Sequence, residues 1–209
     1  MARELTEKEK KRTELFKETT AKMQDKGYSV KPITIGVVEA NVMAVIVMLP
    51  LVAVVAAVYY LAGGSFYFPD YWEFMLVFLL GVVSMPVHEF IHGITWGLFA
   101  ENHMKDIEYG FIVQMLTPYC TCLAPLKKNQ YIIGSMMPTL VLGVLIAVVG
   151  ILTNSFWVIL LSVFNIWGGG GDFNIIIRLL RYNTKGKDVI FIDHPTEVGL
   201  VAFEKEKTS

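Results

Sequence analysis

Residues 86–93, which read PVHEFIHG, place two histidines and a glutamate inside a long apolar stretch. In an α-helix His88 and His92 are four residues apart and share one face, so both imidazoles can reach one metal ion. Zinc lowers the pKa of a bound water toward about 7, and Glu89 is placed to accept its proton and pass it to a leaving amine. The HExxH spacing therefore predicts a metal centre of the kind that hydrolyses peptide bonds.

Histidines in an apolar helix can also be hydrogen-bonded core residues or members of a proton relay. A protein that only binds a metal would not require the intact Glu89. We therefore interpret His88 and His92 as zinc ligands and Glu89 as the catalytic base. A non-catalytic metal-binding or adaptor protein is retained as an alternative.

The third zinc ligand is not part of this motif, although catalytic zinc usually has three protein ligands and a water. Leu98 stands where the metzincin pattern requires a further histidine. Other zincins use a downstream glutamate, which makes Glu101 and Glu108 candidates. Asp172 is the third candidate, because it is the only charged residue between positions 156 and 177.

The composition indicates the elements that position these residues. The chain has 209 residues, of which 54% are hydrophobic and 18% are charged, whereas soluble domains average about 25% charged residues. Four apolar segments are each long enough for a membrane helix, which needs about 20 residues; they cover residues 40–62, 74–100, 131–152 and 156–177. We therefore predict an all-α polytopic membrane protein with about four transmembrane helices.

Lysine and arginine alternate between the connections of these segments. Nine precede the first segment, none lies in the first loop, three lie in the second, none lies in the third and six follow the last segment. Because cytoplasmic loops carry the excess of basic residues, we expect a multi-pass protein of the cell membrane with both termini in the cytoplasm.

This topology selects among the candidate third ligands. The second segment begins near Asp70 on the outside, so His88 and His92 lie roughly 27 and 33 Å along it. The fourth segment also begins outside, near Ser155, and Asp172 lies roughly 26 Å along it by the same rise per residue. An unpaired carboxylate at this depth is costly, so we expect Asp172 to meet the histidines at a metal ion.

Four glycines, residues 168–171, directly precede Asp172. Each costs about 1 kcal/mol relative to alanine inside a helix, so the run requires a reason. A packing contact with the second segment would explain one or two of them. Close approach to the metal or to a peptide substrate would explain all four.

The remaining segments form smaller units. We expect a polar cytoplasmic N-terminal helix in residues 1–35, a transmembrane core in 36–180 and a cytoplasmic tail in 181–209 that contains a small β-hairpin. Alternating apolar residues predict a strand over 107–115. Cys120 and Cys122 are interpreted as small apolar residues of a strand and not as a disulfide, because the side assigned to them is reducing.

The HExxH motif in an apolar segment, followed by an aspartate in a glycine-rich final segment, resembles the site-2 protease family of intramembrane zinc metalloproteases. Closer still, it resembles a family of small membrane proteins described as zincin peptidases, over roughly residues 72–200. Asn165 and Asp172 match the two ends of the aspartate motif of site-2 proteases, one residue closer together. The proline of that motif is absent, and Gly171 and Phe173 replace its leucine and last glycine.

The resemblance implies zinc held by His88, His92 and Asp172. It also implies a membrane-associated β-hairpin at about 105–125 that lies beside the metal and receives an extended substrate. Asn165, Phe111 and Val113 are the expected substrate-binding residues. The predicted function is hydrolysis of membrane-spanning substrates; the alternative enzyme is a zincin with a glutamate ligand that cuts soluble or juxtamembrane peptides. The expected partners are the lipid bilayer and a membrane-protein or peptide substrate, and no nucleic-acid partner is expected.

Overall fold

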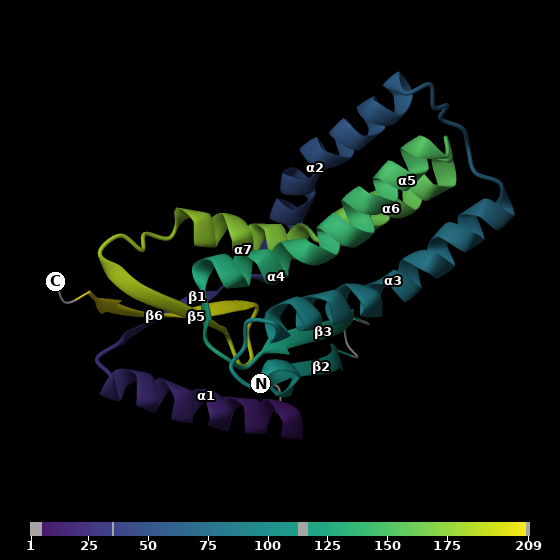
Figure 1. The fold of residues 1–209 in the computed structure, drawn as a ribbon. Coiled ribbons are helices and arrows are strands. Elements are labelled where there is room, and N and C mark those ends of the chain that lie inside the picture. The colour runs from purple at the N-terminus through teal and green to yellow at the C-terminus, as the bar shows by residue number, and fades with distance from the viewer. Residues whose placement is uncertain (1–5, 35, 113–116, 208–209) are drawn as a thin grey trace.

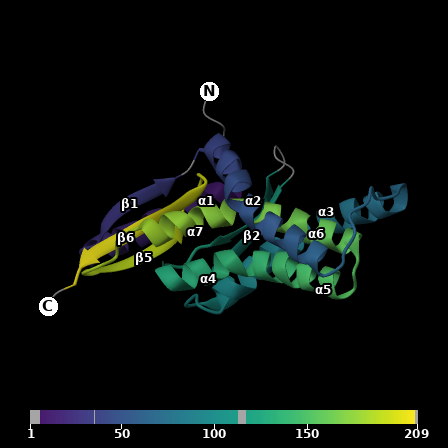
Figure 2. The ribbon, with the colours of Figure 1, turned by 90° about the horizontal axis from the view of Figure 1, so that it is seen from above.

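The computed structural model describes residues 6–34, 36–112 and 117–207. The chain is mostly helical, with two small antiparallel sheets at one end of a bundle of apolar helices (Figure 1). Its elements in chain order are α1 (Glu7–Asp25), β1 (Ser29–Thr34), α2 (Val37–Leu61), α3 (Tyr71–Gly97), η1 (His103–Asp106), β2 (Ile107–Ile112), β3 (Thr117–Cys122), β4 (Leu126–Lys127), α4 (Lys128–Pro138), the π-helical η3 (Thr139–Leu145), α5 (Ile146–Leu152), α6 (Phe156–Gly168), α7 (Gly170–Arg181), β5 (Lys187–Asp193) and β6 (Gly199–Glu206). In the view turned by 90°, the four-stranded sheet lies at one end of the molecule and the far ends of the apolar helices lie at the other (Figure 2).

Three continuous helical segments among the described residues are long and apolar enough to cross a membrane: Asn41–Leu61, Tyr71–Gly97 and Lys128–Leu152. The helices α6 and α7 pass the same test as a pair, but they are bent by 47° at their junction. Large apolar side chains along α2 and α3 are exposed, as expected of a surface that faces lipid. These features are consistent with a membrane protein of three or four spans.

Close packing at the break between α6 and α7 explains why two of the four consecutive residues are glycine. A Cβ added at Gly169 would overlap the hydroxyl of Thr139 in η3, and one added at Gly170 would overlap Ala44 in α2. The glycines thus permit close packing, but against η3 and α2 rather than against α3 as the sequence suggested. The fourth apolar segment is therefore two helices with a bend between them.

The two chain ends meet in one antiparallel sheet of order β1-β6-β5-β4. Val30 of β1 pairs with Phe203 of β6, which also pairs with Ile190 of β5. The predicted C-terminal hairpin is therefore confirmed as β5–β6, but it is part of a larger sheet. The N-terminal segment is not helix alone, because α1 ends at Asp25 and β1 follows it.

Helix α1 connects this sheet to the second, two-stranded sheet. Phe16 and Met23 of α1 pack in one cluster with Phe203 of the large sheet. On the side of the small sheet, the Arg12 guanidinium lies 3.8 Å from the Glu108 carboxylate and 5.3 Å from the ring centroid of Tyr119. Figure 1 shows α1 lying across both sheets.

The predicted hairpin is formed by β2 and β3, with Tyr109 paired to Cys120. It packs on α3, where an added Cβ at Gly93 would overlap the hydroxyl of Tyr109. The glycine one residue after His92 therefore allows the hairpin to lie directly on the helix that carries the motif.

Candidate metal centre

The two histidines of the motif lie one turn apart on α3, and both are buried. The helix begins at a capping box in which the Glu73 backbone N–H donates to the Asp70 carboxylate at 2.8 Å. It continues without interruption through Pro86 to Gly97. The ring centroids of His88 and His92 are 4.8 Å apart, so the helical spacing does present both imidazoles together.

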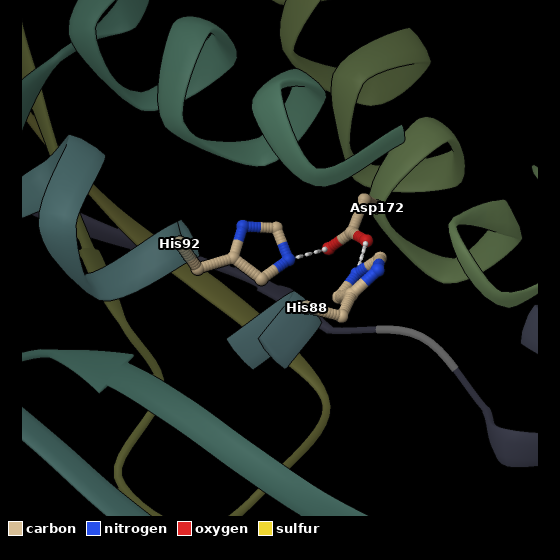
Figure 3. Close-up of side chains that lie close together, drawn as sticks. All are labelled: His88, His92 and Asp172. Atoms are coloured by element: carbon tan, nitrogen blue, oxygen red, sulfur yellow. Dashed lines mark hydrogen bonds and ion pairs between the residues drawn. The ribbon is translucent and has the colours of Figure 1, made fainter. Parts of the chain in front are cut away.

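Asp172 reaches the histidines from the first turn of α7 (Figure 3). Its Oδ2 lies 3.1 Å from His88 Nε2, and its Oδ1 lies 3.2 Å from His92 Nε2. One ligand atom from each residue lies within 4.8 Å of the other two. Within the described ranges, no other group of three His, Cys, Asp or Glu side chains comes this close together.

The hydrogen bonds of His92 show that this donor set fits a cation. Its Nδ1 lies 2.9 Å from the carbonyl oxygen of Gly134, which can only accept, so Nδ1 carries the proton. In the neutral imidazole, Nε2 then directs a lone pair at the Asp172 carboxylate. Two imidazoles and a carboxylate are usual zinc ligands, and zinc-binding histidines commonly donate their other N–H to a carbonyl. We conclude that His88, His92 and Asp172 suit zinc.

The surroundings of His92 fix its ring in this orientation. Trp96 stacks on it with 4.8 Å between ring centroids and 10° between the planes. The indole N–H of Trp96 donates to the carbonyl oxygen of Tyr131 at 3.2 Å. A Cβ at Gly134 would overlap the Trp96 indole, so the glycine lets α4 approach closely enough for its carbonyl to meet His92. The spacing of the motif does not predict this support; the one signal in the sequence is that Trp96 follows His92 by one helical turn.

Glu89 lies beside the three candidate ligands. Its side chain lines two clefts that both include Asp172. Cys120 of β3 lines the second of these clefts together with Glu89. The hairpin thus lies beside the carboxylate that the sequence predicts to be the base.

The larger of the two clefts, here called the apolar cleft, has a volume of about 380 Å³. Apart from the metal-site side chains, its lining is chiefly apolar: Met85, Pro118, Phe164, Ile175 and Val198. It therefore offers the candidate centre an approach for apolar groups.

The second cleft, here called the polar cleft, has a volume of about 290 Å³. It passes along Glu9 and Arg12 of α1 and along His194 and Glu197 of the β5–β6 connection. Asp193 also lines it, and burial raises the pKa of this carboxyl, while hydrogen bonds from its neighbours oppose the shift. The polar cleft offers the centre an approach for water.

The remaining predicted site residues occupy different places. Asn165 is buried, lines the apolar cleft and donates its amide N–H to the carbonyl of Leu161 at 2.9 Å. Phe111 is exposed on β2 and lines neither cleft; Val113 lies outside the described residues. The apolar cleft is bordered instead by Thr117 and Pro118 of β3. Alternation of apolar residues predicts a strand, but it does not show which strand of the hairpin lies against the cleft.

The two glutamates considered as third ligands are not among the residues that meet the histidines. Glu101 is exposed, just after the end of α3. Glu108 lies in the hairpin, 3.8 Å from Arg12 and 3.5 Å from the hydroxyl of Tyr119. Among the three candidates, the structure brings Asp172 alone to the pair of histidines.

Comparison with known families agrees with this chemistry. Residues 81–186 match the model of a family described as "Putative zincin peptidase". This range spans half of the chain and includes both histidines, Glu89 and Asp172. No curated protein and no solved structure matches the chain.

Proposed function

The chain belongs to the family described as "Putative zincin peptidase", and we propose that it is a zinc-dependent intramembrane endopeptidase of the site-2 protease type. The observation that supports this most directly is the meeting of His88 and His92 with Asp172 from the last apolar segment. Glu89 lines the cleft at the same point. A binding site alone would not need a carboxylate there.

In this proposal each group of the chain has one task. Zinc bound by His88, His92 and Asp172 would acidify water and polarise the substrate carbonyl. Glu89 accepts the proton of the attacking water and delivers it to the amine that leaves.

The substrate backbone is proposed to lie along β3. A helical substrate conceals its peptide bonds, whereas an extended one can add to the edge of a sheet. Cys120 of β3 and Glu89 line the same cleft, so a strand added to the edge of β3 that faces away from β2 would pass the base. This replaces Phe111 on β2 as the expected contact. Asn165 has a second amide hydrogen with which to hold the substrate backbone.

The location proposed for the reaction follows from the helices that carry the site. The candidate ligands lie on α3 and α7, and both helices belong to segments apolar enough to cross a membrane. We propose that the substrate is a membrane-spanning protein or peptide, cut near the cytoplasmic face, and that both termini of the enzyme are cytoplasmic.

The test is the variant Glu89→Gln, because the amide retains the shape of the side chain but cannot accept the proton. Purified wild type and variant are compared for bound zinc by metal analysis and for cleavage of a model membrane substrate in proteoliposomes. We expect the variant to keep zinc and to lose cleavage. Glu101→Gln is the matched control, since it makes the same change at an exposed position.

Two results would contradict the proposal. Full cleavage by Glu89→Gln would remove Glu89 as the base. Loss of zinc in this variant would make Glu89 a ligand or a structural group instead.

A further inference from the structure

The apolar cleft leaves empty space directly beside the candidate metal centre. At one end it is bounded by His88, Glu89 and Asp172, and its other walls are mainly apolar. Its volume of about 380 Å³ is within the range of about 300–1,000 Å³ found for pockets that hold small ligands. A chemically reactive end and an apolar body would suit a peptide whose side chain enters while its backbone stays at the centre.

Two glycines keep this cleft open. Gly168 ends α6 and Gly171 lies next to Asp172, and both line the apolar cleft. A Cβ added at either position would meet no atom within 4 Å, and neither residue has the positive φ that favours glycine. The neighbouring Gly169 and Gly170 differ, since a Cβ there would overlap Thr139 or Ala44.

Packing therefore accounts for the inner two glycines, whereas neither packing nor backbone conformation accounts for the outer two. Alanine or leucine would favour a helix more than glycine does at these positions. The property that Gly168 and Gly171 do provide is empty volume next to Asp172. Side chains at these two positions would occupy the cleft.

We propose that the apolar cleft is the substrate side-chain pocket, that it takes one bulky apolar residue adjacent to the scissile bond, and that Gly168 and Gly171 set its size. This inference rests on the proposed peptidase function. The substrate class is then a membrane segment cut beside leucine, isoleucine, methionine or phenylalanine. Small residues leave the pocket unfilled, and charged residues lose their hydration without gaining a partner.

The test uses Gly168→Leu, which fills the pocket without touching the ligand-bearing turn. Gly36→Leu is the matched control, because Gly36 also has no atom within 4 Å of an added Cβ and lies outside the cleft. A series of model membrane substrates carries phenylalanine, leucine or alanine next to the cleavage site, which is mapped by mass spectrometry. Bound zinc and thermal stability are measured for each variant.

One methylene group in an apolar pocket changes kcat/KM by about 10-fold to 200-fold. We expect the wild type to prefer phenylalanine and leucine over alanine by at least about 10-fold. In Gly168→Leu the value for the phenylalanine substrate should fall by at least about 10-fold, and the value for the alanine substrate should fall much less, so that the preference for phenylalanine is lost. Gly36→Leu should behave as wild type, and all three proteins should hold zinc.

The outcomes separate this inference from the proposed function. If the wild type cleaves all substrates equally, or if Gly168→Leu with full zinc slows all of them equally, the pocket assignment is wrong and the peptidase function stands. If the wild type cuts none of them, the peptidase function fails. The pocket can then still be tested by measuring how the same substrates bind to Glu89→Gln and to the double variant Glu89→Gln/Gly168→Leu. If both proteins bind substrates with bulky and with small residues equally well, the pocket assignment is wrong.

Discussion

Replacing Asp172 by alanine is the most discriminating perturbation of the candidate centre. Its two carboxylate oxygens lie 3.1 and 3.2 Å from the Nε2 atoms of His88 and His92, so the change removes one of three protein ligands and leaves both histidines in position. Two histidines alone provide fewer protein ligands than catalytic zinc normally has. We expect weaker zinc binding and no cleavage.

The size of the effect can be worked out from ligand linkage. Changing a residue that only supports a metal ligand lowers metal affinity by about 10–100-fold, so removing a ligand should cost at least about 100-fold. Zinc at 100 times its dissociation constant stabilises the fold by about 2.7 kcal/mol, but by only about 0.4 kcal/mol at the dissociation constant itself. The variant should therefore lose about 2.3 kcal/mol of zinc-dependent stability. For a chain of this length this corresponds to roughly 5–9 °C in the melting temperature.

The assay is a thermal melt of the detergent-purified protein at a series of zinc concentrations, with zinc affinity measured by competition against a chelator. The controls are Glu101→Ala and Glu108→Ala, which remove the other two candidate carboxylates. Both should keep the zinc-dependent shift of the wild type. Glu108→Ala should lower the stability at every zinc concentration by a similar small amount, since it removes the contacts to Arg12 and Tyr119.

One result would refute this reasoning. If Glu108→Ala or Glu101→Ala loses zinc while Asp172→Ala keeps it, Asp172 is not the third ligand. The zincin class with a glutamate ligand would then replace the site-2 protease type.

Three further outcomes are expected. Gly134→Ala should weaken zinc binding by about 10–100-fold and destabilise the fold by about 1–3 kcal/mol, because the new Cβ overlaps Trp96. Chelator competition measures the zinc affinity and thermal melts measure the stability. Unchanged values would exclude the Gly134 carbonyl as a support of the site. Burial and the Asp193 carboxylate raise the pKa of the Cys122 thiol to about 12, so it should resist maleimide at pH 7–9 until the protein is denatured; rapid labelling of the folded protein at pH 8 would contradict this burial. Cysteines introduced at 127–128 should react only from the cytoplasmic side and those at 63–65 only from outside, and the reverse pattern would invert the proposed topology.

Much of the candidate centre was predictable because its determinants are local or follow from topology. The spacing of His88 and His92 is a property of one helix, and basic residues in the loops placed Asp172 at the same depth. The support around His92 was not predictable in this way. Whether Gly134 meets Trp96 depends on how closely α4 approaches α3, and nothing in the sequence near either residue specifies that distance.

The apolar segments and the hairpins were also readable from periodicity and length. The sheet that joins both chain ends was not, because the partner of Val30 in β1 is Phe203 in β6, and alternation in one strand does not identify a distant partner. The position of the bend at Gly169 and its packing partners were not predictable for a related reason. A glycine run shows that close approach is possible, but only the packed structure shows that η3 and α2 make the approach.

The pairing of β1 with β6 has a consequence for biosynthesis. The ribosome makes β1 early and β6 only after every apolar segment has emerged, so the contact order of this sheet is high and its closure is a late folding event. The polar cleft has α1 on one wall and the connection that precedes β6 on another, so it is completed after all the helices. A nascent chain halted at the end of β5 should therefore carry all its candidate zinc ligands without this wall. Pulse proteolysis of stalled chains should find α1 undocked until β6 has been released.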